Sequence, residues 1–169
     1  MVVILPDGGR SYLSKLYDDE WMRANGLLAT TGAVVRVGQL LSERHNGPEM
    51  PDVVLARTTD RVGEAIDTLQ RFGISQLPVS QDPEGDALEG IVGSVSEQGL
   101  LDRAYRNPEI VGRTVGEVMD RPFPTVDVDA SLDEAFAALS GGSAALLSIR
   151  GGRPAGVITK LDLLEFLAH

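Results

Sequence analysis

The stretch Asp60-Arg-Val-Gly-Glu-Ala-Ile-Asp-Thr-Leu69 is repeated, in altered form, as Ser131-Leu-Asp-Glu-Ala-Phe-Ala-Ala-Leu139. In both copies the apolar residues recur at the i, i+3, i+4, i+7 spacing that places them on one face of a helix. Glu64 and Glu134 hold the same place in the two copies. A duplication with so long a period is typical of two small modules rather than of a solenoid. Each module has an apolar face to bury, and a cleft between two modules can hold a small molecule.

The similarity extends to both sides of this helix. Before it, Val37-Gly-Gln-Leu-Leu41 matches Val115-Gly-Glu-Val-Met119. After it, Gly90-Ile-Val-Gly93 matches Gly156-Val-Ile-Thr159, and each is followed by a pair of leucines. In this alignment Gly93 stands at the place of Thr159, and Ser96 at the place of Asp162.

Each repeat therefore reads as helix, strand, helix, strand, strand, helix. The extended runs are 76–80 and 90–95 in the first copy and 144–149 and 156–159 in the second. Gly151-Gly-Arg-Pro154 supplies a hairpin turn, and Ser131 with Glu134 forms a capping box. This order predicts an α+β fold.

Composition limits the classes of function. The 169 residues are 43% hydrophobic and 24% charged, as in an ordinary globular protein. Without cysteine the chain has no disulfide framework, and no apolar run is long enough to span a membrane, so a cytoplasmic location is expected. The formal net charge of −10 and the scattered basic residues argue against a nucleic-acid partner.

The first thirty residues do not belong to the repeat. Val2-Val-Ile-Leu5 is a short β-branched run that ends at the turn signal Pro6-Asp-Gly-Gly9, and a helix is expected over 18–25. One strand and one helix are too little to fold alone. We expect this piece to pack on other structure.

The two copies resemble a tandem pair of CBS domains, the Bateman module, above all in Gly156-Val-Ile-Thr-Lys-Leu-Asp-Leu-Leu164. The resemblance implies two β-α-β-β-α repeats with pseudo-two-fold symmetry, at 37–106 and 112–169. The segment Val2-Val-Ile-Leu-Pro-Asp-Gly-Gly-Arg10 is similar to the last strand of the pyridoxal-phosphate domain of the cystathionine β-synthases. Residues 1–31 are therefore interpreted as the edge of a catalytic domain plus a linker, and the rest as the regulatory end of such an enzyme.

Thr159-Lys-Leu-Asp162 is the strongest candidate for a binding site. Its hydroxyl and carboxylate straddle the end of a strand and the first turn of a helix, where a carboxylate can accept both hydroxyls of a ribose. The same spacing is also an ordinary helix cap that needs no ligand. The resemblance implies that Thr159 and Asp162 bind ribose. Because the first copy lacks the carboxylate, we expect one site per chain.

The resemblance also implies the opposite wall of this cleft, in the segment 73–79 of the first copy. Ile74 and Leu77 would sandwich a base, and Gln76 with the neighbouring backbone would read its edge. For the apolar members, core packing is the alternative. The full set of expected ligand-binding residues is Thr159, Asp162, Ile74, Ser75, Gln76, Leu77, Pro51, Val53 and Ile158.

The ligand expected is S-adenosylmethionine, with AMP or ATP as alternatives. A nucleotide would require basic side chains near its phosphates. The segments expected to line the cleft offer few basic residues beyond Lys160. No catalytic residue or metal site is expected, since neither Lys15 nor Lys160 matches the Schiff-base lysine of the pyridoxal-phosphate enzymes. That cofactor would belong to a catalytic domain, in the same or a paired chain. A homodimer is expected, and a dimerisation or stability scaffold without ligand is the competing interpretation.

Overall fold

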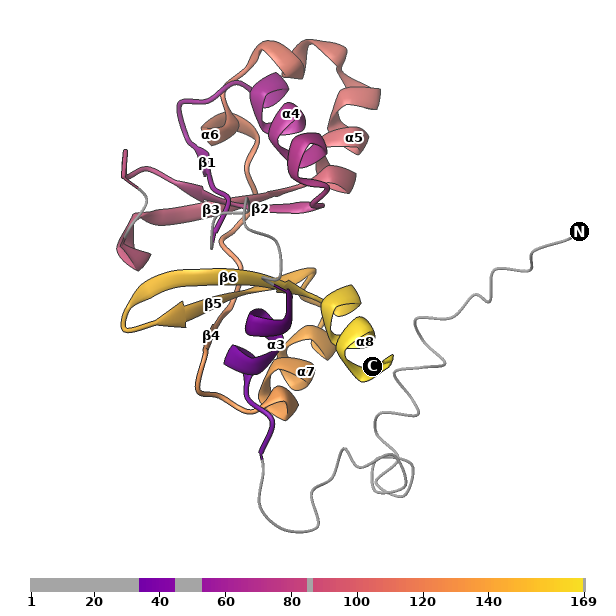
Figure 1. The fold of residues 1–169 in the computed structure, drawn as a ribbon. Coiled ribbons are helices and arrows are strands. Elements are labelled where there is room, and N and C mark those ends of the chain that lie inside the picture. The colour runs from indigo at the N-terminus through magenta and orange to yellow at the C-terminus, as the bar shows by residue number, and fades with distance from the viewer. Residues whose placement is uncertain (1–33, 45–52, 85–86, 169) are drawn as a thin grey trace, which may run out of the picture. The chain divides into compact units, whose positions relative to one another are not determined.

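A computed structural model describes residues 34–44, 53–84 and 87–168 of the chain. The strand and helix expected near the N-terminus, and with them the whole of the 1–31 segment, lie outside the described residues. Figure 1 shows the described part as two similar layered halves, each with a small sheet and its own helices.

The first repeat is built on the sheet β1 (Ala56–Arg57), β2 (Gln76–Ser80) and β3 (Ile91–Ser96), in that order. Strands β1 and β2 are parallel, and β2 and β3 are antiparallel. Helices α4 (Val62–Phe72) and α5 (Glu97–Arg106) pack on the sheet, followed by the short 3-10 helix η2 (Pro108–Gly112). Helix α4 ends at Gly73, which has the left-handed φ of 61° that glycine adopts without strain.

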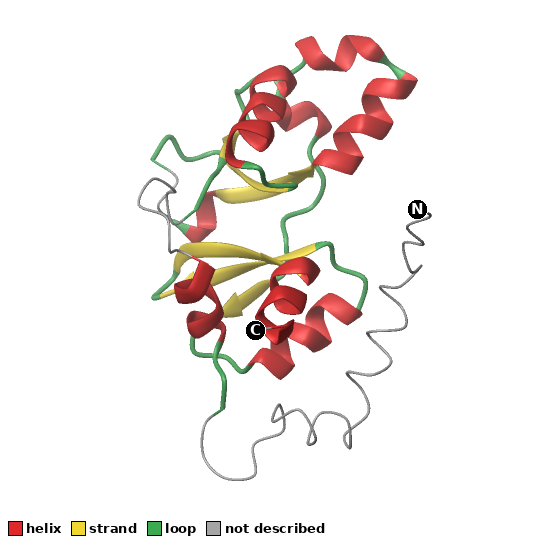
Figure 2. Ribbon diagram, turned by 45° about the vertical axis from the view of Figure 1, so that its right-hand side comes forward, coloured by secondary structure: helices red, strands yellow, loops and turns green. Residues whose placement is uncertain are grey.

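The second repeat has the same topology. Its sheet is β4 (Thr125–Asp127), β5 (Ala145–Arg150) and β6 (Arg153–Thr159), with a parallel and then an antiparallel pair. Helices α7 (Leu132–Ser140) and α8 (Lys160–Ala168) pack on it (Figure 2). The expected α+β pattern of β-α-β-β-α repeats is confirmed.

The apolar periodicity of the repeated helix has the expected result. Val62, Ala65 and Leu69 of α4 are buried, and Leu132, Ala135 and Leu139 of α7 are buried at the same places. The cap expected for α7 is also present, since the Ser131 hydroxyl accepts the N–H of Glu134. Each of these helices therefore covers its own sheet with the face that the sequence marks as apolar.

The helix that precedes each repeat packs on the other repeat. Helix α3 (Val37–Arg44) docks on the second one: Val37 N–H donates to Ala130 at 3.0 Å, and Gly38 N–H donates to Val128 at 2.8 Å. Helix α6 (Val115–Val118) docks on the first one, where Val115 N–H donates to Asp60 at 2.8 Å. In Figure 1, α3 lies beside α7 and α8, whereas α6 lies beside α4. The exchange ties the two repeats into one pseudo-symmetric body.

Each repeat contributes its own core. In the first, residues of all three sheet strands, of α4, α5 and η2, and of the exchanged helix α6 form one buried cluster: Ala56, Val62, Ala65, Leu69, Leu77, Val79, Val95, Leu100, Ile110, Val115 and Val118. Within the described ranges, the structure has no helix long and apolar enough to cross a membrane.

Candidate functional site

The end of β6 and the start of α8 form a closed cap. The backbone N–H and the hydroxyl of Thr159 both donate to Oδ2 of Asp162, each at 2.6 Å. The N–H of Asp162 points back to the Thr159 hydroxyl at 3.4 Å. Both residues are half-buried. The carboxylate is therefore fixed at the helix N-terminus, where the helix dipole favours its negative charge. The capping interpretation of this motif is correct, and a fixed carboxylate is also what a sugar-diol site needs.

The strand register corrects the alignment of the two copies. Ser96 pairs with Gln76 at the end of β3, and Thr159 pairs with Ala145 at the end of β6. The Ser96 hydroxyl accepts the N–H of Gly99 at 3.0 Å, just as Thr159 is approached by Asp162. Ser96 is thus the counterpart of Thr159, and Gly99 the counterpart of Asp162. The expected equivalences, Gly93 with Thr159 and Ser96 with Asp162, are wrong by three residues.

The wrong alignment arises because the apolar sequence of β3 can be matched to that of β6 at two offsets. A shift of three residues along a strand turns every side chain to the opposite face. Val95 is 1% exposed and Ile158 is fully buried, so these two are counterparts, whereas Val92 is only half-buried. The leucines that follow, Leu100 and Leu163, then coincide as well, each 2% exposed.

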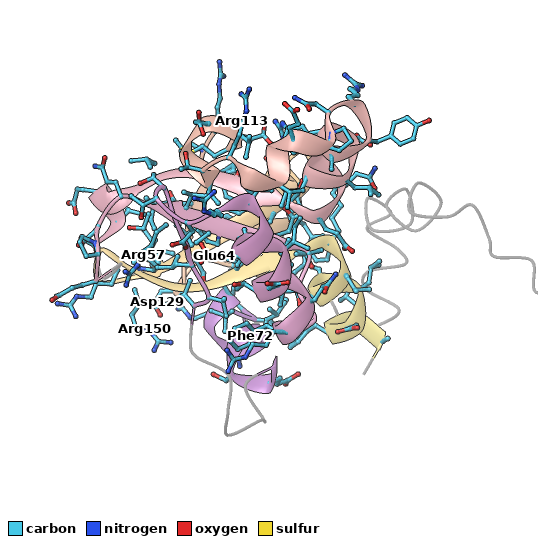
Figure 3. The ribbon with its side chains drawn as sticks, turned by 90° about the horizontal axis from the view of Figure 1, so that it is seen from above. Arg57, Glu64, Phe72, Arg113, Asp129 and Arg150 are labelled. Atoms are coloured by element: carbon cyan, nitrogen blue, oxygen red, sulfur yellow. The ribbon has the colours of Figure 1, made fainter. Side chains whose placement is uncertain are left out.

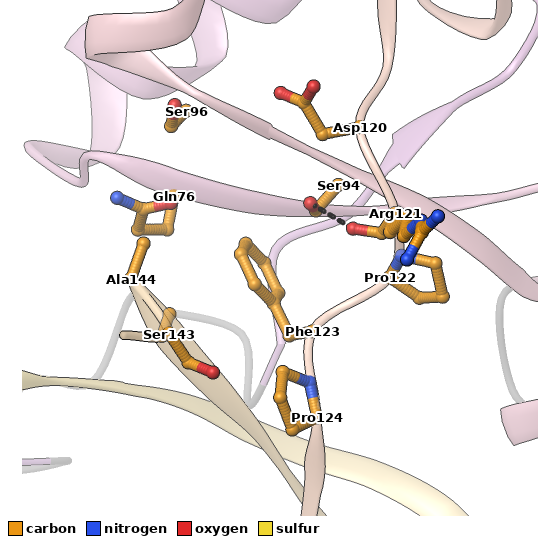
Figure 4. Close-up of a pocket in the computed structure, with 11 residues that line it drawn as sticks. Gln76, Ser94, Ser96, Asp120, Arg121, Pro122, Phe123, Pro124, Ser143 and Ala144 are labelled. Atoms are coloured by element: carbon orange, nitrogen blue, oxygen red, sulfur yellow. Dashed lines mark hydrogen bonds between the residues drawn. The ribbon is translucent and has the colours of Figure 1, made fainter. Parts of the chain in front are cut away.

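A cavity of about 470 Å³ opens beside Ser96, and we call it the Ser96 cleft (Figure 4). The first repeat supplies Gln76, Ser94 and Ser96 to its wall. Its other walls come from the segment that leads into β4 and from the start of β5: Asp120, Arg121, Pro122, Phe123, Pro124, Ser143, Ala144 and Ala145. Phe123 and the prolines give it a flat apolar side, and Asp120 lies across from Gln76 and Ser96 in Figure 4.

The Ser96 cleft has a different charge arrangement from the Thr159 cap. Gly99 provides no carboxylate, and a Cβ added there would lie 3.1 Å from Nη1 of Arg103 and 3.6 Å from Oδ2 of Asp120. Arg103 and Asp120 form a bidentate ion pair, with N–O distances of 3.2 and 2.5 Å. A guanidinium, already neutralised by a partner, therefore stands near the place where the second repeat has the Asp162 carboxylate.

The linker between the repeats is held against the Ser96 cleft by backbone contacts. Asp120 and Ser94 exchange two backbone hydrogen bonds of 2.8 and 3.1 Å, and the Ser94 hydroxyl donates to the carbonyl of Arg121 at 2.6 Å. This segment was not singled out by the sequence. In the sequence, only the position of this segment immediately before β4 could have indicated it, because it corresponds to residues 51–54 before β1.

The remaining expected site residues fall into different environments. Gln76 lines the Ser96 cleft, and its Oε1 is buried without a partner among the described side chains. Ser75 is exposed, and its carbonyl accepts the N–H of Glu97 at 2.9 Å. Ile74 packs against the core of the first repeat, which favours the packing interpretation for that residue.

Four more residues complete that set. Leu77 and Ile158 are completely buried core residues, so only their backbone can face a cleft. Val53 is half-buried. Pro51 lies outside the described residues, which also leaves one wall of the expected Thr159 cleft outside them.

Charged groups elsewhere are dispersed. In Figure 3, Arg113 lies well apart from Arg57 and Arg150. The part of the chain that the structure describes contains no group of three or more histidine, aspartate or glutamate residues able to hold a metal ion. The described acidic and basic residues thus serve mainly as caps, as isolated pairs and as solvated surface.

Comparison with known proteins identifies the repeats. A model of the CBS domain matches the chain twice, over residues 49–105 and 115–169. Cystathionine beta-synthase of Saccharomyces cerevisiae is 28% identical over 205 residues, which cover 99% of this chain and 38% of that protein. Cystathionine beta-synthase of Dictyostelium discoideum is 24% identical, over 98% of this chain and 34% of that protein. The chain thus spans little more than a third of the length of these curated relatives.

Solved structures share the fold. The CBS-domain pair of protein MJ0100, in complex with 5′-methylthioadenosine and S-adenosyl-L-methionine, superposes with a TM-score of 0.62 at 20% identity. The match covers 80% of this chain and 98% of that chain. At this identity the likeness concerns the fold alone.

Proposed function

We propose that this chain, which belongs to the CBS-domain family as a tandem pair of repeats, binds an adenosyl ligand, S-adenosylmethionine before AMP or ATP. A CBS pair is a regulatory module, not a catalytic one. In our proposal the bound ligand controls a cystathionine β-synthase-type enzyme of sulfur amino-acid metabolism. The catalytic domain, which would carry the pyridoxal phosphate, lies in the same chain or in a paired one.

The observation that carries the proposal is the Thr159–Asp162 pair. A half-buried carboxylate is fixed at a helix N-terminus by two donors at 2.6 Å. Such a preorganised acceptor can take the two hydroxyls of a ribose, at about 1.5–3 kcal/mol for a hydrogen bond to a charged group. Its negative charge also suits a ligand that carries a sulfonium and an ammonium group better than a polyphosphate.

The comparisons favour the adenosyl class and the enzyme type. Two curated relatives are named cystathionine beta-synthase, and one solved CBS pair carries S-adenosyl-L-methionine in its title. Regulation would act through a change in the arrangement of the module, which requires that the ligand bind one arrangement more tightly than another. We further propose that the module works as a homodimer.

A ligand-free scaffold is the second candidate, and two observations favour it. The cap accounts for both hydrogen bonds of Thr159 without a ligand. Helix α5 also exposes two large apolar side chains one turn apart, Leu101 at 61% and Tyr105 at 90%. In this alternative these side chains would serve assembly, and the module would contribute only stability.

Calorimetric titration of the full chain with S-adenosylmethionine, 5′-methylthioadenosine, AMP and ATP separates the two. We expect S-adenosylmethionine to bind, and Asp162→Ala to weaken it by about 2–3 kcal/mol, roughly 30- to 150-fold in affinity. Because Asp162→Ala also removes a cap, Ser131→Ala is the matched control. It removes the α7 cap of the same repeat and should leave the affinity unchanged.

Two outcomes contradict the proposal. Absence of heat and of a thermal shift with every adenosyl compound would leave the scaffold as the function. Equal affinity in wild type and Asp162→Ala, with both folded, would reduce Asp162 to a cap.

A further inference from the structure

A leucine of helix α3 lies directly on the strand that leads to Thr159. A Cβ added to Gly156 of β6 would lie 2.7 Å from Cδ2 of Leu41 and 3.6 Å from its Cδ1. Leu41 is 4% exposed, and Gly156 is buried. Only a glycine lets the side chain approach the strand backbone this closely. The contact therefore fixes the distance between α3 and β6, because no free space separates them at this point.

Two further contacts hold the same strand and helix. The Ser148 hydroxyl donates to the carbonyl of Gly156 at 2.9 Å, within the buried part of the sheet. Near the start of α3, Gly38 N–H donates to the Val128 carbonyl, and a Cβ at Gly38 would lie only 3.2 Å from that oxygen. Because Gly38 and Leu41 are three positions apart, they lie on the same face of α3. This face therefore contacts two segments of the second repeat. Three residues after Gly156, β6 ends at Thr159.

The first repeat has the same contact made by the other exchanged helix. Met119, which follows α6, presses on Gly93 of β3, and a Cβ at Gly93 would lie 2.9 Å from Cγ of Met119. The two contacts differ in what they join. Met119 connects two internal parts of the module, whereas α3 is continuous with the chain that precedes Arg36.

We infer that Leu41 is a positioning residue of the Thr159–Asp162 site, and that α3 links this site to the chain segment before Arg36. The inference rests on the proposed function and states through which contact the ligand would act, namely that of Gly156 with Leu41. A ligand that moves the end of β6 must move Gly156 against Leu41, because close-packed contacts cannot absorb the shift. By linkage, the factor by which the ligand shifts the position of α3 is also the factor by which a displacement of α3 changes the affinity of the site for the ligand. Through α3, the chain before Arg36 is joined to the second repeat, although it comes before the first repeat in sequence.

The test compares Leu41→Ala with Met119→Ala in the full chain. Both remove a side chain that lies against a strand glycine, so both are expected to lower stability. Titration with S-adenosylmethionine, under conditions where circular dichroism shows both variants folded, measures the affinity. We expect Leu41→Ala to weaken binding about fivefold or more, the lower end of usual coupling, and Met119→Ala to weaken it less than twofold. Leu41→Met, which keeps the volume, should restore the affinity.

Amide hydrogen exchange gives a readout that does not depend on affinity. In the wild type we expect S-adenosylmethionine to slow exchange in the first turn of α3 and to leave α6 unchanged. Equal affinity losses in Leu41→Ala and Met119→Ala, or ligand protection that spares α3, would overturn the inference.

The inference can also fail separately from the proposed function. If no adenosyl compound binds, the proposed function fails, and the exchange of the unliganded variants still decides the positioning role. Leu41→Ala should then accelerate exchange at the end of β6, and Met119→Ala at the end of β3. Wild-type exchange at the end of β6 in Leu41→Ala would refute the role of Leu41.

Discussion

Arg103 donates to both carboxylate oxygens of Asp120, at 3.2 and 2.5 Å, and so ties α5 to the segment that enters the second repeat. The two side chains are 35% and 52% exposed. Pairs in such a setting are screened by water and salt, so bidentate geometry adds only modestly to stability. The pair matters more for what it places in the Ser96 cleft than for what it contributes to folding.

A double-mutant cycle with Arg103→Ala and Asp120→Ala should give a coupling energy of about 0.2–1 kcal/mol. Urea unfolding of the wild type, the two single variants and the double variant measures it. The coupling should decrease as salt is raised, because both groups contact solvent. A coupling well above this range that salt leaves unchanged would show that the pair is shielded and contradict the exposure given above.

Gly93→Ala should destabilise the module by about 1–3 kcal/mol, the usual cost of overpacking. The added methyl group would lie 2.8 Å from the backbone oxygen of Asp120 as well as against Met119. That oxygen cannot retreat easily, since it accepts the N–H of Ser94. Thermal and urea unfolding measure the effect.

Gly112→Ala is the matched control for this substitution, because nothing lies within 4 Å of the position a Cβ would take there. Its effect should stay within about 0.5 kcal/mol. Combining Gly93→Ala with Met119→Ala should recover part of the loss and not all of it, since the Asp120 oxygen remains. Wild-type stability in Gly93→Ala would show that β3 and the linker are not in close contact.

The fold follows from signals that each lie within a few residues. The apolar face of α4 and α7, the hairpin turn at Gly151 and the Ser131 cap all depend on local spacing, and the structure has them as expected. The exchange of α3 and α6 has no such signal. A helix with an apolar face is satisfied by either repeat, and the choice depends on backbone contacts such as Gly38 with Val128.

The candidate site was predictable only in part for the same reason. The Thr159–Asp162 cap is a local motif, and its geometry agrees with the spacing. The Arg103–Asp120 pair joins residues 17 positions apart through the fold of the linker, and neither residue carries a motif. The alignment of the two copies is shifted by three residues at Ser96 because the apolar sequence of a strand does not fix its own register. The register of β3 is fixed by its pairing with β2.

Glu117 should make the docking of α6 sensitive to acid. The backbone N–H of Thr114 donates to its Oε2 at 3.0 Å, and the Thr114 hydroxyl donates at 3.1 Å. The backbone bond is the largest cause that lowers the pKa of Glu117, followed by the hydroxyl bond. Desolvation opposes them, and the charge of Arg113 has the smallest effect, which also lowers the pKa. A carboxylate with a lowered folded pKa contributes stability above its unfolded pKa and loses it as pH falls through the folded pKa.

Glu117→Gln should therefore lower stability at neutral pH, and its difference from the wild type should shrink below about pH 4.3, the usual glutamate pKa. Urea unfolding across this range measures the difference. Thr114→Ala keeps the backbone donor and should give the same trend in weaker form. A stability difference between the wild type and Glu117→Gln that grows as pH falls would contradict the lowered pKa of Glu117.

The two repeats should differ in occupancy, with one adenosyl ligand bound per chain. Asp162 gives the second repeat a carboxylate held by Thr159. In the first repeat Gly99 has no carboxylate, and Asp120, which lines the Ser96 cleft, is already paired with Arg103. A ribose diol would have to compete with that ion pair for Asp120. Titration with S-adenosylmethionine, with the protein concentration fixed by amino-acid analysis, should give a stoichiometry near one. Ser96→Ala should preserve both stoichiometry and affinity. Two equivalent sites per chain would mean that the Ser96 cleft also binds the ligand. Binding that survives Asp162→Ala and is lost in Ser96→Ala would mean that the ligand site is the Ser96 cleft.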